Sequence, residues 1–175
     1  MYKKTIRFVE GKARNFASFS TYFSFSMSHE NGNGLDFVMV PRTFDVNVMN
    51  NSSFGVSFNE NHVGIDVGSL VSVKVRNLSS VNVVLNHGEK LHSWIDYEVT
   101  SKRLEIRLSQ TSSTRPNDPL FLHSIDLSKL WNDEEVFVGL SSSNGNCSQT
   151  SFIHSWSFKL RPVPNWMHSQ PLHRL

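Results

Sequence analysis

Apolar and polar residues alternate with a period of two along most of the chain, and this alternation constrains the fold more than any other feature. In the segment FSTYFSFSM, the side chains predicted to share one face are Phe19, Thr21, Phe23, Phe25 and Met27. Successive side chains of a β-strand point to opposite faces of the sheet, so the pattern predicts a strand with one buried aromatic face. The same reasoning predicts strands over residues 35–40, 71–76, 81–85, 94–99, 104–108, 135–140 and 151–160.

Two of these segments, 94–99 and 104–108, are predicted to form a hairpin that turns near Ser101 and Lys102. Roughly nine short strands separated by turn signals are typical of an antiparallel sandwich or barrel. A single helical turn is expected at 125–131, with Asp126 as its N-terminal cap. The last strand is expected to carry on one face Phe152, His154, Trp156, Phe158 and Leu160.

The length of 175 residues suits one domain, which we assign to residues 1–160. The tail 161–175 contains three prolines and has no period, so we expect an extended linker or a disordered end. No segment approaches the roughly 20 apolar residues of a membrane helix. The N-terminus MYKKTIRFVEG is basic but lacks an apolar core, so it does not form a complete signal peptide.

Charge and side-chain chemistry exclude several functions. The net charge of +2 comes from dispersed basic residues, so no nucleic-acid partner is expected. The acids Asp133, Glu134 and Glu135 are consecutive, so they cannot all face one glycosidase cleft, and we predict that the chain is not an enzyme. Cys147 is the only cysteine and is expected to be a spectator thiol. Four sequons are candidate N-glycosylation sites, with chance occurrence left open, at Asn50, Asn51, Asn77 and Asn146.

Several stretches resemble the legume-type (L-type) lectin domain of plants, in the order found in that family. They are FSTYFSFSM, GNGLDFVMVP, NHVGIDVGSL, WIDYEVTSKRLEIRL and VFVGLSSSNGNCSQTSFIHSWSFKL. The chain is particularly similar to the ectodomain of L-type lectin receptor kinases. The resemblance implies an antiparallel jelly-roll sandwich with the concanavalin A-like lectin/glucanase fold. It also implies carbohydrate binding without catalysis, glycans or glycoproteins as partners, and an extracellular or cell-surface location.

In the intact family, Ca²⁺ and a transition metal such as Mn²⁺ hold the loops that bind the sugar. His62, within HVGID, matches the family's transition-metal histidine. The acidic residues that the family places upstream are missing, and Ser57 stands where the last of them is expected. His62 is therefore interpreted as the remnant of a ligand set, with no metal cofactor expected. We also expect that one strand and the metal loop are lost, so that residues 52–58 join directly to 59–66.

The sugar site implied by the resemblance is also altered. In GNGLDF, Asn33 replaces the family's aspartate and Gly34 follows it, while Asp36 takes a position that is usually small. The loop 141–149 matches the specificity loop, in which Ser142, Ser143 and Asn144 are candidate sugar contacts or parts of an ordinary solvated loop. We therefore predict weak or absent sugar binding.

The alternative is a structural or interaction protein that pairs with intact lectin ectodomains through an open sheet edge. Trp94 and Trp156 are expected in the core rather than as sugar platforms.

Overall fold

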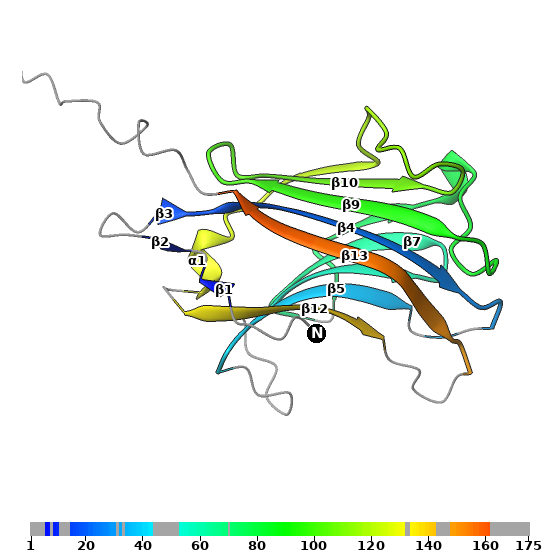
Figure 1. Cartoon of the computed structure of the whole chain (residues 1–175), viewed down its shortest axis with the longest axis horizontal. Coiled ribbons are helices and arrows are strands. Elements are labelled where there is room, and N and C mark those ends of the chain that lie inside the picture. The colour runs from blue at the N-terminus through cyan, green and yellow to red at the C-terminus, as the bar shows by residue number, and fades with distance from the viewer. Residues whose placement is uncertain are drawn as a thin grey trace, which may run out of the picture.

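Two antiparallel sheets lie face to face in a computed structural model (Figure 1). It describes residues 6–7, 9–10, 15–30, 32, 34–43, 53–69, 71–131, 134–142 and 148–161. One sheet has the order β11–β10–β9–β4–β13. Its strands are β4 (Ser18–Met27), β9 (Leu91–Glu98), β10 (Arg103–Ser109), β11 (Phe121–Ser124) and β13 (Ser151–Arg161).

The second sheet has the order β1–β12–β5–β6–β7–β8. Its strands are β1 (Ile6–Arg7), β5 (Leu35–Pro41), β6 (Phe54–Asn59), β7 (His62–Val67), β8 (Lys74–Asn77) and β12 (Glu135–Ser142). The short strands β2 (Val9–Glu10) and β3 (Asn15–Phe16) pair with each other. The predicted all-β sandwich is confirmed.

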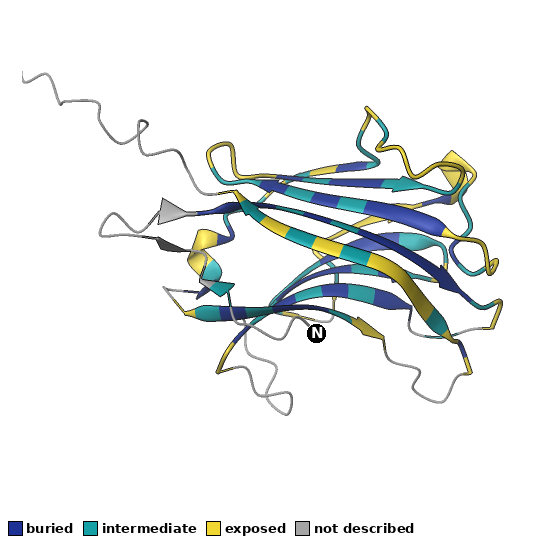
Figure 2. Ribbon diagram, in the orientation of Figure 1, coloured by how far each residue is buried: buried dark blue, intermediate teal, exposed yellow. Residues whose placement is uncertain are grey.

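The core fills the space between the sheets, as the alternation in the sequence requires. Phe19, Phe23 and Phe25 of β4 are fully buried. Rings from the two sheets meet there: the centroids of Phe23 and Phe58 are 5.7 Å apart and nearly perpendicular, a favourable aromatic geometry. Figure 2 shows this burial along β4 and β9, whereas β13 is largely exposed.

The hairpin of β9 and β10 and the helical turn α1 (Ser128–Trp131) are confirmed. Asp126 lies two residues before α1, and its carboxylate accepts hydrogen bonds from Ser128 Oγ at 2.5 Å and Lys102 Nζ at 2.6 Å, which are side-chain donors and not the backbone N–H groups of the expected cap. The Leu127 N–H donates to the Tyr97 hydroxyl at 3.3 Å, and burial raises the pKa of Tyr97 to about 12. Within the described ranges, no helix has the length and apolar character needed to cross a membrane.

Four expectations about strands are wrong. The segment 81–85 forms no strand, because a 3₁₀ turn, η1 (Ser79–Val81), ends at its first residue and is followed by turns. In the segment 71–76, only the residues from Lys74 onward form a strand, and Val71, Val73 and Val75 are exposed. Arg161, which the sequence assigned to the tail, still belongs to β13.

The fourth error concerns the faces of β13, which contains an irregularity between Ile153 and Ser155. Before it, Ile153 lies opposite the buried Phe25; after it, Trp156 lies opposite the buried Phe23. Phe152 therefore shares a face with Ser26, away from the core. The irregularity adds one residue to β13, so Trp156 and the alternate residues after it point toward the core. His154 also points outward, since its Nε2 lies 3.1 Å from Ser26 Oγ.

The short connection expected before His62 is present, and the strands on its two sides are neighbours in the sheet. β6 pairs with β5 on one side and with β7 on the other, and it buries Phe54, Val56 and Phe58. β6 and β7 are joined by a turn of only two residues, Glu60 and Asn61. β6 therefore lies directly between β5 and β7, and the expected loss of a strand relative to the family stays a prediction.

Candidate carbohydrate-binding site

Loops at one end of the sandwich meet around Gly34, just before β5. Gly34 is buried with a φ of +79°, a left-handed conformation that glycine adopts without strain. A Cβ at this position would lie only 2.0 Å from the Phe58 carbonyl oxygen. Gly34 thus allows the loop before β5 to press directly against the backbone at the end of β6.

Gln149, just before β13, ties this loop to the rest of the site. Its side-chain Oε1 accepts a hydrogen bond from the Gly34 N–H at 3.1 Å, and its Nε2 donates to the Glu30 carbonyl at 3.1 Å. Only 3% of Gln149 is exposed. A Cβ at Gly32 would lie 2.3 Å from the Gln149 Cβ, so the absence of a side chain at Gly32 makes room for the amide.

Further hydrogen bonds hold the same segments together. The Ser142 hydroxyl, at the end of β12, donates to the Gly34 carbonyl at 2.8 Å. Ser28 and Thr150 are joined twice, by the Ser28 N–H to the Thr150 carbonyl and by the Thr150 N–H to Ser28 Oγ, both at 3.0 Å. The loop after β4 and the loop before β13 are therefore linked by both backbone and side-chain contacts.

A polar depression of about 270 Å³ opens beside this network, and its lining is Gly32, Glu60, Asn61, Asn86 and Gln149. Amides supply both donors and acceptors, and the Glu60 carboxylate supplies further acceptors. Sugar hydroxyls need both kinds of partner. This volume lies just below the range of about 300–1,000 Å³ that is typical of sites for drug-sized ligands.

The residues near His62 do not fit the Ca²⁺ and Mn²⁺ sites of the family. His62 begins β7 and lies opposite Asn59 on β6 and Asn77 on β8. The Oδ1 atoms of Asn59 and Asn61 are buried and accept no hydrogen bond from the described residues, but both are neutral. Calcium prefers 6–8 oxygens that include carboxylates. The described part of the chain contains no group of three or more His, Cys, Asp or Glu residues that could hold a metal ion.

Asp36 points away from the core, because its neighbours Leu35 and Phe37 are the buried residues of β5. Burial, and to a smaller degree the charge of Asp66, raises the pKa of Asp36 to about 6. Asp66 itself accepts a hydrogen bond from Ser72 Oγ at 2.6 Å. The charge of Asp66 therefore acts on Asp36 at the outer face of the six-stranded sheet.

The structure brings together two of the predicted sugar contacts, Gly34 and Ser142. Of the other predicted site residues, His62 and Asn77 are described, and the remainder lie outside the described residues: Asn33, Ser143, Asn144, Asn50, Asn51 and Asn146. Asn77 is exposed at the end of β8, and its Oδ1 accepts a hydrogen bond from the Ser79 N–H at 2.8 Å.

Sequence reasoning missed Gln149, Asn61 and Asn86. Gln149 lies within the loop that resembles the specificity loop, but only its position opposite Gly32 and Gly34 distinguishes it from the other polar residues there.

These features define a class of protein: a two-sheet antiparallel sandwich with a small depression among the loops at one end. The chain belongs to the legume lectin domain family, whose sequence profile matches residues 1–60 and 43–174. The match identifies a carbohydrate-binding lectin domain, of a family that is generally not catalytic.

Two relatives from Arabidopsis thaliana are receptor kinases. L-type lectin-domain containing receptor kinase VIII.2 is 30% identical over 185 residues, which cover 90% of this chain and 26% of the relative. Probable L-type lectin-domain containing receptor kinase S.7 is 31% identical over 194 residues, which cover 91% of this chain and 28% of the relative. The chain thus spans about a quarter of the length of these relatives.

A solved structure, winged bean acidic lectin complexed with methyl-α-D-galactose, matches with a TM-score of 0.77 and 27% identity. The match covers 93% of this chain and 78% of that chain. The predicted family and jelly-roll fold are confirmed.

Proposed function

We propose that this domain binds a neutral glycan weakly in the 270 Å³ depression, and that it does so without a metal ion. The observation that carries the proposal is the buried Gln149 amide, which joins the Gly34 and Glu30 backbone groups. In the family that the chain resembles, metal ions hold the loops of the site. Here hydrogen bonds from Gln149 and Ser142 perform that task.

The binding is expected to be weak because the depression is small and shallow. One carboxylate, that of Glu60, lines it, and charge-assisted hydrogen bonds are the strong ones in polar recognition. We expect a dissociation constant of about 1 mM, which corresponds to about −4 kcal/mol.

A glycan array probed with and without a chelator tests this proposal. We expect the same weak signals in both conditions, and we expect Gln149→Ala to abolish them. Signals that disappear with chelator would show that a metal ion is needed. A complete lack of signal at high protein concentration would show that the domain has lost sugar binding.

The exposed edge of the six-stranded sheet favours a second candidate function, an interaction protein that pairs with intact lectin ectodomains. β8 is the last strand of this sheet and has one hydrogen-bonded neighbour, β7. Beside it Val71, Val73 and Val75 are 76%, 55% and 54% exposed. Unpaired strand edges bind other strands, and apolar side chains strengthen such contacts. Co-purification with a full-length lectin ectodomain, lost on Val73→Lys, would support this function.

We also propose an extracellular location, which the similarity to receptor kinases with lectin domains supports. The exposed position of Asn77 makes this sequon accessible to glycosylation. Expression behind a secretion signal tests the idea: a mass increase that peptide N-glycosidase removes, and that Asn77→Gln reduces, is the expected result. An unmodified Asn77 in the secreted protein would contradict its use as an acceptor.

A further inference from the structure

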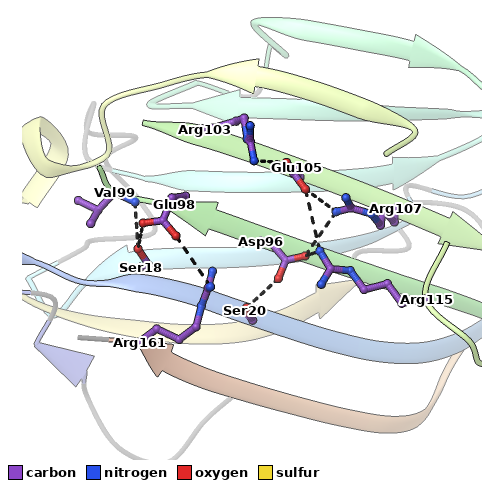
Figure 3. Close-up of polar contacts among 10 residues, drawn as sticks. All are labelled: Ser18, Ser20, Asp96, Glu98, Val99, Arg103, Glu105, Arg107, Arg115 and Arg161. Carbon is purple, nitrogen blue, oxygen red and sulfur yellow. Dashed lines mark hydrogen bonds and ion pairs between the residues drawn. The ribbon is translucent and has the colours of Figure 1, made fainter. Parts of the chain in front are cut away.

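The outer face of the five-stranded sheet carries a group of charged side chains that the glycan site does not use (Figure 3). They surround a depression of about 210 Å³, and its lining is Ser20, Asp96, Glu98, Arg103, Glu105, Arg115 and Arg161. Ser20 lies seven residues before Met27, where β4 reaches the glycan site. That separation is about 20 Å along a strand, so the two sites are distinct.

Two carboxylates form the base of this charged depression. The Asp96 side chain accepts a hydrogen bond from Ser20 Oγ at 2.7 Å and one from Arg115 Nη2 at 2.7 Å. The Glu105 side chain contacts Arg103 Nη2 at 2.8 Å and Arg107 Nη1 at 2.6 Å. Both carboxylates are thus already neutralised, and they fix the positions of the surrounding guanidinium groups.

Arg107 anchors the arrangement from below. Its side chain is 9% exposed, and its Nη2 donates to the Asn117 carbonyl at 3.3 Å, which holds the loop that carries Arg115. Burial alone would raise the pKa of Glu105, but the contact with Arg107 and the charges of the neighbouring arginines lower it overall. Glu105 therefore stays ionised.

Three arginines at the rim remain about half exposed: Arg103 at 58%, Arg115 at 47% and Arg161 at 50% of the side chain. The ion pair of Arg161 with Glu98, at 3.8 Å, is longer than the shortest ion pairs of Arg103 and Arg115, at 2.8 and 2.7 Å. Lys159 lies on the same face, opposite Ser20. A guanidinium has five N–H donors in a planar fork, so each rim arginine keeps donors that can bind a carboxylate through two oxygens.

We propose that this depression binds a uronic acid residue of an acidic glycan. The rim guanidinium groups take the carboxylate, with Arg161 and Lys159 nearest to solvent. Glu98, whose side chain is 41% exposed, accepts hydrogen bonds from the sugar hydroxyls.

The mixture of charges selects this ligand class. Sulfate or phosphate offers acceptors and no hydroxyl donors, so it gains nothing from the exposed Glu98 carboxylate, which can only accept hydrogen bonds. A uronic acid offers one planar carboxylate and several hydroxyl donors, which match both kinds of group at the rim. The open sheet face also leaves room for the rest of a polysaccharide chain on either side of the bound residue.

Calorimetric titration with the trimer of galacturonic acid tests the proposal. We expect binding that weakens as salt is added, because salt screens exposed charges. Arg161→Gln should weaken it by about tenfold, the effect of losing one charge-assisted interaction. Arg42→Gln is the matched control. Arg42 follows β5 in the other sheet, and its side chain is 69% exposed and lies 3.3 Å from the Glu135 carboxylate. This variant should bind the trimer like the unchanged protein.

Several results would overturn the proposal. One is that the Arg161→Gln variant binds the trimer as tightly as the unchanged protein does. Another is that the fully methyl-esterified trimer binds as tightly as the free acid. A third is that hexaglutamate competes as well as the trimer for the site, which would indicate an acidic peptide as the ligand. If Arg161→Gln disturbs the circular dichroism spectrum, Lys159→Gln provides the same test. Gln149→Ala separates the two sites, because it should affect neutral glycans and leave binding of the trimer unchanged.

Discussion

Gln149→Ala is expected to lower the free energy of unfolding by about 2–5 kcal/mol. The Gly34 N–H is buried and would lose its acceptor, which costs about 1–3 kcal/mol. The Glu30 residue is exposed, so water replaces the lost donor there and the net loss is about 0.5–1.5 kcal/mol. The deleted methylene of the buried side chain contributes about 0.8 kcal/mol more.

Urea unfolding followed by tryptophan fluorescence measures this change, with the slope of the transition checked for constancy. Gln110→Ala is the matched control, since Gln110 is only half-buried in the loop after β10, and its effect should remain within about 0.5 kcal/mol. An effect of Gln149→Ala as small as that of the control would refute the idea that this amide holds the site together.

Three further changes are predicted from single positions. Asp36 keeps its proton up to about pH 6 in the folded chain. Between about pH 4 and 6 the folded protein therefore binds more protons than the unfolded chain. The free energy of unfolding falls as pH rises through this window. Asp36→Asn should remove this fall and stabilise the domain by about 1–3 kcal/mol at pH 7, as unfolding curves at several pH values would show; an unchanged pH profile would contradict it. Gly34→Ala should destabilise the domain by more than about 1 kcal/mol, measured by thermal melting, because its Cβ would collide with the Phe58 carbonyl; an unchanged melting temperature would count against the close approach. Val73→Lys should reduce self-association in size-exclusion chromatography at high concentration, and an unaltered elution profile would argue against the exposed valines as a contact surface.

The alternation of side chains predicted most of the sandwich because one face of each long strand is buried. Phe19 and Phe23 of β4, and Ile95 and Tyr97 of β9, are buried as the pattern requires. The pattern failed where strands lie at an edge. Val73 and Val75 alternate like core residues, but among the described strands β8 pairs with β7 alone, and these side chains are exposed.

The irregularity in β13 could not be predicted from its sequence. In SFIHSWSFKL, Phe152, Trp156, Phe158 and Leu160 keep a period of two, yet one extra residue near His154 reverses the faces of the preceding residues. Such a shift is decided by the register with β4, where Ile153 lies opposite Phe25, and not by the local pattern. Phe152 is 60% exposed for this reason.

The candidate site was predicted in part. Resemblance pointed to Gly34 and Ser142, which do meet, through a hydrogen bond of 2.8 Å. The resemblance could not identify Gln149, because the sequence alone predicts that a polar residue in a serine-rich loop is exposed to solvent. Trp94 was also misplaced: it lies opposite Tyr22 on the outer face of its sheet, 5.2 Å from that ring, while Trp156 packs against the core as expected.

The turn between β6 and β7 is short, and the buried amide of Gln149 helps to fix the loops beside it. A two-residue connection holds few side chains that could surround an ion, so the end of β6 must be fixed in another way. Gly34 achieves this by placing its backbone against the Phe58 carbonyl, and Gln149 then holds Gly34 from the opposite side. The contacts are neutral and do not depend on a ligand that can dissociate. We therefore expect the thermal stability of the domain to be the same with and without a chelator, and a fall in melting temperature on chelation would show that a metal ion still takes part in holding these loops.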